Sequence, residues 1–131
     1  MVRMSRASRS ILMLKDSEIT TTIIEAIQEK KGHAISVVDL SDVEGAGIRS
    51  FVICEGRTPT QVGAIADSVR DYVLEHTHRK PYATDGFRNC QWIVLDYGEI
   101  LVHVFLPEER QRYNLEELWS DGKITEIPDL D

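Results

Sequence analysis

The chain has 131 residues, of which 42% are hydrophobic and 28% are charged. This length fits one globular domain, which can bury a core without disulfide bonds or a structural metal. No apolar run approaches the roughly 18 residues needed to cross a bilayer, so we expect no membrane-spanning segment and a cytoplasmic location.

Charge is distributed unevenly along the chain. Residues 1–15 carry four basic side chains and no acidic one, whereas residues 16–131 carry 22 acidic residues against 11 basic ones, a net charge of −11. Such an acidic body repels phosphate backbones, which argues against direct nucleic-acid binding as the main function. It suits a basic protein partner through long-range steering, or it serves only to keep the surface soluble.

We divide the chain into three parts. Residues 1–15 are predicted to be a basic, disordered extension, residues 16–120 the folded domain, and residues 121–131 an acidic tail. The Arg- and Ser-rich start has the composition of a transit peptide, but it is short and lacks an apolar face. A disordered tail or an upstream start codon explains it better.

The first predicted element is a helix capped by Asp16 and Ser17 and closed by Gly32 in the left-handed conformation. Two strands follow, at His33–Leu40 and Ser50–Glu55, because both runs are short, apolar and rich in β-branched residues.

The second helix has the clearest start signal in the sequence. Thr58-Pro59-Thr60-Gln61 places a capping threonine, a proline at the first helical position and a glutamine three residues after the cap. Apolar residues then recur at helical spacing as far as about His76 and predict one buried stripe. They are Val62, Ile65, Ala66, Val69, Tyr72 and Val73.

Histidines and cysteines give no metal site and no cofactor site. His76 and His78 lie two residues apart, which points them to different faces of a helix. Cys54 and Cys90 sit in apolar runs, where buried reduced thiols are expected in place of a disulfide or redox pair. Thr84-Asp85-Gly86 marks a loop.

A β-hairpin is predicted from Asn89–Asp96 and Glu99–Leu106, joined by a two-residue turn at Tyr97-Gly98. This turn would pair Asp96 with Glu99. One face of the hairpin is then wholly aliphatic and must belong to the core. It consists of Ile93, Leu95, Ile100, Val102 and Val104.

The other face of the hairpin mixes aromatic, polar and aliphatic residues. In this register Trp92 lies opposite His103, with Asp96 and Phe105 nearby. An uncovered face of this kind would be a good docking surface, because a central tryptophan can supply about 2 kcal/mol of binding energy or more. Alternatively a helix covers this side too, and Trp92 and His103 are core residues.

The hairpin and three other segments resemble the ribosomal silencing factor family, also called RsfS or iojap. The four segments agree in order and spacing, and the resemblance covers roughly residues 17–120. They are Phe51–Gly56 (FVICEG), Val62–Asp67 (VGAIAD), Trp92–Phe105 (WIVLDYGEILVHVF) and Arg110–Trp119 (RQRYNLEELW). The chain departs from the family pattern at Arg49-Ser50 and in the turn at 55–59.

The resemblance implies a single-domain α/β fold, with a mixed sheet of about five strands packed with helices, related to nucleotidyltransferases. It also implies a non-enzymatic protein, without metal or cofactor, that binds large-subunit ribosomal protein fourteen and blocks subunit joining when nutrients are scarce. An assembly factor for the large subunit is the alternative; peripheral rRNA contact and a homodimer off the ribosome stay open. Carried over by motif, the partner-binding residues are Trp92, Asp96, Tyr97, His103, Gly86 and Tyr113.

Two catalytic hypotheses compete with this role. Nucleotidyl transfer needs clustered carboxylates and a Gly-Ser turn. Here Asp129-Leu130-Asp131 has the spacing of such a pair but lies in a tail expected to fray. Asp39 and Asp96, at strand ends, could approach each other, and both could equally cap turns. Cys54 lies near a helix start, where a thiolate could be stabilised, but no histidine partner is fixed by spacing. We expect neither activity.

Overall fold

The computed structural model describes residues 6–130. Its elements follow one another as α1 (Arg6–Glu29), β1 (His33–Asp39), β2 (Ser50–Glu55), α2 (Pro59–Thr77), β3 (Ala83–Asp85), β4 (Trp92–Asp96), β5 (Ile100–Phe105), α3 (Pro107–Tyr113), α4 (Leu115–Leu118) and β6 (Lys123–Ile127). Within these residues, no helix is long and apolar enough to span a membrane.

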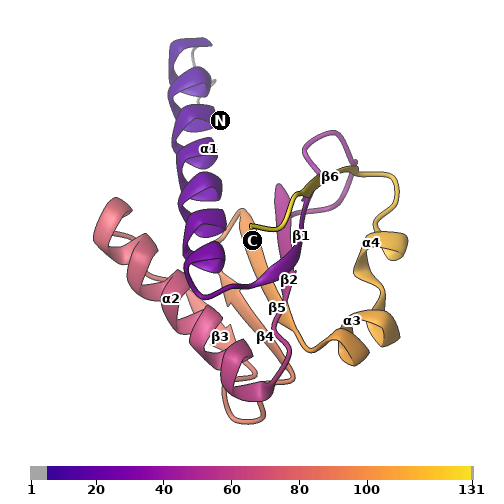
Figure 1. Ribbon diagram of the computed structural model, residues 1–131. Coiled ribbons are helices and arrows are strands. Elements are labelled where there is room, and N and C mark those ends of the chain that lie inside the picture. The colour runs from indigo at the N-terminus through magenta and orange to yellow at the C-terminus, as the bar shows by residue number, and fades with distance from the viewer. Residues whose placement is uncertain (1–5, 131) are drawn as a thin grey trace.

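The strands form one mixed sheet in the order β3-β4-β5-β2-β1-β6. β2 and β5 run parallel, and the other neighbours are antiparallel. The long helices α1 and α2 lie side by side on one face of the sheet, and the short helices α3 and α4 lie on the other side (Figure 1). The predicted α/β class with a mixed sheet is confirmed.

Helix α2 forms as its sequence predicts. The Thr58 side chain accepts a hydrogen bond from the Gln61 amide at 3.1 Å, and the Gln61 side chain accepts one from the Arg57 amide at 2.7 Å. Both bonds satisfy backbone donors that the first helical turn leaves free. The predicted apolar stripe faces the sheet and is buried, except that Tyr72 is only partly buried.

Helix α1 differs from the prediction at both ends. It begins at Arg6, ten residues before the expected start, so residues 6–15 are helical and not a disordered extension; residues 1–5 lie outside the described residues. After Glu29 it is Lys31 (φ 58°) that adopts the left-handed conformation, and not Gly32. Gly32 is needed for space, because a Cβ there would lie 2.4 Å from a methyl group of Ile27.

The sheet has six strands where about five were expected. Lys123–Ile127, assigned to an acidic tail, pairs antiparallel with β1 and forms the edge strand β6. The boundary at residue 120 is therefore wrong. The loop predicted around Thr84 contains β3, which pairs with β4. Both strands are short and largely exposed, so neither leaves a periodic apolar pattern.

The hairpin forms, but its register differs by two residues from the prediction. Trp92 lies opposite Phe105, and Asp96 lies opposite Leu101. The turn is Gly98-Glu99, because the Tyr97 amide donates to the Ile100 carbonyl at 2.9 Å. Gly98 has φ +93°, the conformation that a tight hairpin turn requires at its first central residue. A shift of two residues preserves the faces, so the aliphatic face is buried as predicted.

Tyr97 falls on the buried face of this register. Its side chain is 1% exposed and packs in the core under α1 and α2. Burial raises the pKa of its phenol to about 12, and its hydroxyl has no hydrogen-bond partner among the described residues. Such a buried hydroxyl costs stability and gains nothing in return.

Replacing Tyr97 by phenylalanine should therefore leave the fold intact. We expect Tyr97→Phe to keep the free energy of unfolding unchanged or to raise it by up to about 1 kcal/mol, because an unpaired buried donor is removed. Urea denaturation at neutral pH measures this. A loss above about 1 kcal/mol would show that the hydroxyl makes a bond in solution.

Candidate docking surface

The second face of the sheet is only half covered. Loop 40–49 and helices α3 and α4 pack on its β1, β2 and β5 part and bury an apolar cluster there. The cluster consists of Val38, Leu40, Phe51, Ile53 and Phe105, with Leu115 and Trp119 packed against it. The β3–β4 part of this face has no helix over it.

An aromatic row connects the covered part to the open part. Tyr113 of α3 packs on Trp92, with ring centroids 4.6 Å apart, and Trp92 stacks on Phe105 at 5.0 Å. The Trp92 indole Nε1 donates a hydrogen bond to His103 Nδ1 at 3.1 Å, so the imidazole carries its proton on Nε2. Trp92 is thus fixed in orientation on one side and is only partly buried on the other.

The exposed and half-buried residues around this tryptophan form what we call the Trp92 surface. Strand alternation places its β3, β4 and β5 members on the same face, and Tyr113 adds a ring that is 46% exposed. The surface comprises Ala83, Asp85, Trp92, Val94, Asp96, Leu101 and Tyr113. It is apolar at its centre and acidic at its rim.

The structure separates the six predicted partner-binding residues into two groups. Trp92, Asp96 and Tyr113 lie on the Trp92 surface, and Gly86 lies directly behind it. His103 and Tyr97 are 5% and 1% exposed, so a partner could touch neither of them extensively. Each of the two alternatives for this face therefore holds in part, because His103 is a core residue whereas Trp92 is only partly buried.

Gly86 follows β3 directly, at a point of very close backbone contact. Its φ is +94°, and a Cβ at this position would lie 2.0 Å from the Trp92 carbonyl oxygen. Gly86 also accepts a hydrogen bond from the Cys90 amide at 2.9 Å, which closes the loop before β4. No residue with a side chain fits here without displacing the backbone of Trp92.

We expect Gly86→Ala to destabilise the domain by about 3 kcal/mol or more, since it adds a backbone clash to conformational strain. Gly45→Ala is the matched control, because Gly45 has φ +78° but nothing within 4 Å of its added Cβ. It should cost about 1–2 kcal/mol from conformation alone. Chemical denaturation of both variants tests this; equal losses would mean that the close contact at Trp92 is unimportant.

His103 is held neutral inside the covered part of the face. Burial lowers its pKa to about 4, and its Nε2 has no hydrogen-bond partner among the described residues. Its ring instead lies edge-on against Phe51, with centroids 5.0 Å apart. Protonation would place a charge among aromatic rings and would turn Nδ1 from an acceptor into a donor, which breaks its bond with Trp92.

This burial predicts a specific loss of stability in mild acid. The unfolded state binds a proton at His103 below about pH 6.5, whereas the folded state does so only near pH 4, so stability falls as pH drops through this window. From pH 7 to pH 5 the loss should be about 2 kcal/mol.

Denaturation at both pH values compares the wild type with His103→Gln, which keeps an acceptor for Trp92 but does not titrate. The variant should lose about 2 kcal/mol less than the wild type over this interval. An identical pH dependence in the two proteins would contradict the assignment.

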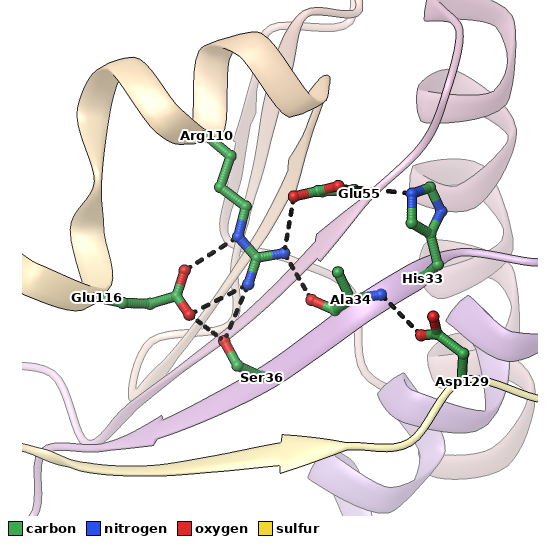
Figure 2. A network of polar contacts seen from close by, with 7 residues as sticks. All are labelled: His33, Ala34, Ser36, Glu55, Arg110, Glu116 and Asp129. Atoms are coloured by element: carbon green, nitrogen blue, oxygen red, sulfur yellow. Dashed lines mark hydrogen bonds and ion pairs between the residues drawn. The ribbon is translucent and has the colours of Figure 1, made fainter.

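A buried arginine links the α3–α4 segment to the sheet (Figure 2). Nε and Nη2 of Arg110 donate to Glu116 at 3.0 and 3.2 Å, and Nη1 donates to Glu55 at 3.3 Å and to the Ala34 carbonyl. Nη2 also donates to the Ser36 hydroxyl at 3.3 Å. Burial alone would raise the pKa of Glu116, but the hydrogen bonds and charge of Arg110 outweigh it and lower that pKa. We call these contacts the Arg110 network. The sequence patterns did not predict it.

The catalytic hypotheses find little support in the geometry. Asp39 and Asp96 lie in β1 and β4, three strand spacings or roughly 14 Å apart. Each caps a turn: hydrogen bonds from Ser41 lower the pKa of Asp39, and Asp96 accepts from the Gly98 amide at 2.7 Å. Burial raises the pKa of Cys54 to about 12, which opposes a reactive thiolate. In the described residues no histidine, cysteine or carboxylate cluster could hold a metal ion.

Comparison with known proteins gives a consistent family match. A family model described as "Ribosomal silencing factor during starvation" matches residues 14–131, which include β6. Ribosomal silencing factor RsfS of Bacillus subtilis (strain 168) is 34% identical over 104 residues, covering 78% of this chain and 85% of that protein. The protein of the same name from Halalkalibacterium halodurans is 28% identical over 114 residues, or 87% and 96% of the two chains. A crystal structure of a Chromobacterium violaceum protein superposes with a TM-score of 0.75 at 31% identity, covering 79% of this chain and 85% of that one.

Proposed function

The chain belongs to the ribosomal silencing factor family, and from this we propose that it binds the large ribosomal subunit through the Trp92 surface. Its partner there is large-subunit ribosomal protein fourteen, as the family resemblance implies. A domain seated on the face that meets the small subunit prevents joining by occupying space, and it needs no chemical step. The protein would thereby repress translation in the cytosol when nutrients are limiting.

One observation carries this proposal: a preformed patch with one exposed and one partly buried aromatic ring lies on the uncovered half of the sheet. Trp92 and Tyr113 pack on each other, and half-buried Val94 and Leu101 extend the apolar area. Tryptophan and tyrosine are the residues that most often dominate binding energy at protein interfaces. Because Trp92 is held by the His103 hydrogen bond, little rotamer entropy is lost on docking.

Charge supports a basic partner. Of the seven residues of the Trp92 surface, Asp85 and Asp96 are acidic and none is basic. They flank Val94, since Asp85 pairs with Val94 across the strands and Asp96 follows it by two residues on β4. Residues 16–131 carry a net charge of −11, which adds long-range attraction toward a basic protein.

We also propose that the protein acts without catalysis. The strand-end carboxylates are engaged as turn caps, and the thiol of Cys54 is buried. A role in large-subunit assembly would use the same surface, and the particle that is bound distinguishes the two roles. Mature large subunits indicate silencing, whereas binding restricted to immature particles would indicate assembly.

Asp85→Lys should weaken binding to purified large subunits about tenfold, because it sets a like charge against the basic partner. The side chain is exposed, so the fold should be unaffected. Trp92→Ala is a poorer test, since it also removes the His103 bond and the stacking on Phe105.

The matched control is Asp71→Lys, the same charge change at an exposed position of α2 on the opposite side of the sheet. It should bind within about twofold of the wild type, and the gap between the variants should narrow as salt screens the charges. Sedimentation with separated subunits over a salt series measures both. Equal affinities would place the contact elsewhere, and wild-type binding to neither subunit would reject the function.

A further inference from the structure

Helices α3 and α4 cover half of the second face with little apolar anchorage. Neither helix has a fully buried side chain. Leu115 and Trp119 pack against the apolar cluster but are only partly buried. A helix of four to seven residues is also too short to be stable by itself in water. Some other contact must therefore fix this segment to the sheet.

Arg110 supplies that contact, because its guanidinium uses all five N–H donors. Two go to Glu116 of α4, one to Glu55 of β2, and two to Ser36 and the Ala34 carbonyl of β1 (Figure 2). The Arg110 side chain is only 13% exposed. Charge-assisted hydrogen bonds shielded from water are among the strongest polar contacts in proteins.

The Arg110 network is connected to the Trp92 surface by one turn of α3. Arg110 and Tyr113 are three residues apart on α3 and therefore lie on neighbouring positions of the helix surface. The hydrogen bonds that hold Arg110 thus also set how far Tyr113 lies from the sheet. Tyr113 packs on Trp92 with ring centroids 4.6 Å apart. Loss of the network would free α3 to move and would take Tyr113 away from the indole.

We propose that Arg110 is the positioning residue of the Trp92 surface: it touches no partner but holds α3 so that Tyr113 and Trp92 form one preassembled patch. The inference rests on the proposed function for its binding consequence. Its structural consequence, the seating of Tyr113 on Trp92, does not depend on that function.

Lysine cannot replace this arginine, since an ammonium group has three donors and lacks the planar fork that matches a carboxylate. The proposal therefore requires Arg110→Lys and Arg110→Gln to behave alike. A role that depended only on positive charge would be kept by lysine and lost with glutamine. The matched control is Arg112→Gln on the same helix, where the side chain is 70% exposed.

The first arm of the test measures the surroundings of Trp92. The sequence has two tryptophans, so Trp119→Phe leaves Trp92 as the single tryptophan, which is excited selectively at the red edge of the absorption band. In this background Arg110→Gln should shift the emission to the red and raise acrylamide quenching, as Tyr113→Ala should do. Arg112→Gln should change neither. Unaltered emission in a folded Arg110→Gln protein would overturn the proposal.

The second arm measures affinity for large subunits well below the melting temperature. Arg110→Gln and Arg110→Lys should each weaken binding about tenfold, and Arg110→Gln should cost less than about twofold when Tyr113 is already alanine. A merely structural role would leave affinity unchanged while the protein is folded, or would give the same loss in both backgrounds; either result overturns the proposal.

Glu116→Gln provides a second variant of the Arg110 network. Where Arg110→Gln does not fold, Glu116→Gln weakens the same network and should give the same changes at about threefold in affinity; normal emission and affinity in that variant would overturn the proposal. Where the wild type binds no large subunits, the proposed function fails, and the emission arm still decides whether Arg110 positions Tyr113.

Discussion

The burial of one face of the β4–β5 hairpin under α1 and α2 determines what the other face can do. Ile93, Leu95, Val102 and Val104 are completely buried, and together they remove a large apolar area from water. Because strand side chains alternate, this burial forces Trp92 and its neighbours outward. A slip of one residue in β4 would put the indole among the helices and Ile93 and Leu95 in solvent, so the energy of the core fixes the position of the docking surface.

The outward face is held by two different kinds of contact. Near β5 and β2 it is an ordinary core, where rings pack on one another and His103 stays neutral. At its edge the Arg110 network replaces apolar burial with directional bonds to four other residues. Apolar contacts tolerate small displacements, whereas a guanidinium with five fixed acceptors does not. The directional bonds of Arg110 therefore lie beside the Trp92 surface, whose shape must be defined for docking.

Sequence reasoning predicted the elements whose signals are local. The cap at Thr58, the stripe of α2 and the two hairpin faces are set within a few residues, and the faces survive a register error of two. The predicted pairing between β4 and β5 was wrong because the turn lies at Gly98-Glu99 and not at Tyr97-Gly98. The choice between these two turns depends on the packing of Tyr97 in the core, which the local sequence does not show.

Strand β6 was missed because its residues are mostly exposed and gain their structure only by pairing with β1. The sequence around Arg110 did not predict its network, because its acceptors lie as many as 76 residues away in the chain. Only Glu116, six residues later, is a nearby acceptor.

The place of β1 in the sheet has a consequence for synthesis of the protein. β1 is made early, but its two neighbours are β2, which follows soon after, and β6, which comes last. Until residues 123–127 have left the ribosomal exit tunnel, one edge of β1 keeps its backbone donors and acceptors unpaired, and Asp129 cannot yet accept from the Ala34 amide. The sheet is therefore completed only after residues 123–127 have emerged, and until then the nascent domain carries β1 as an open edge.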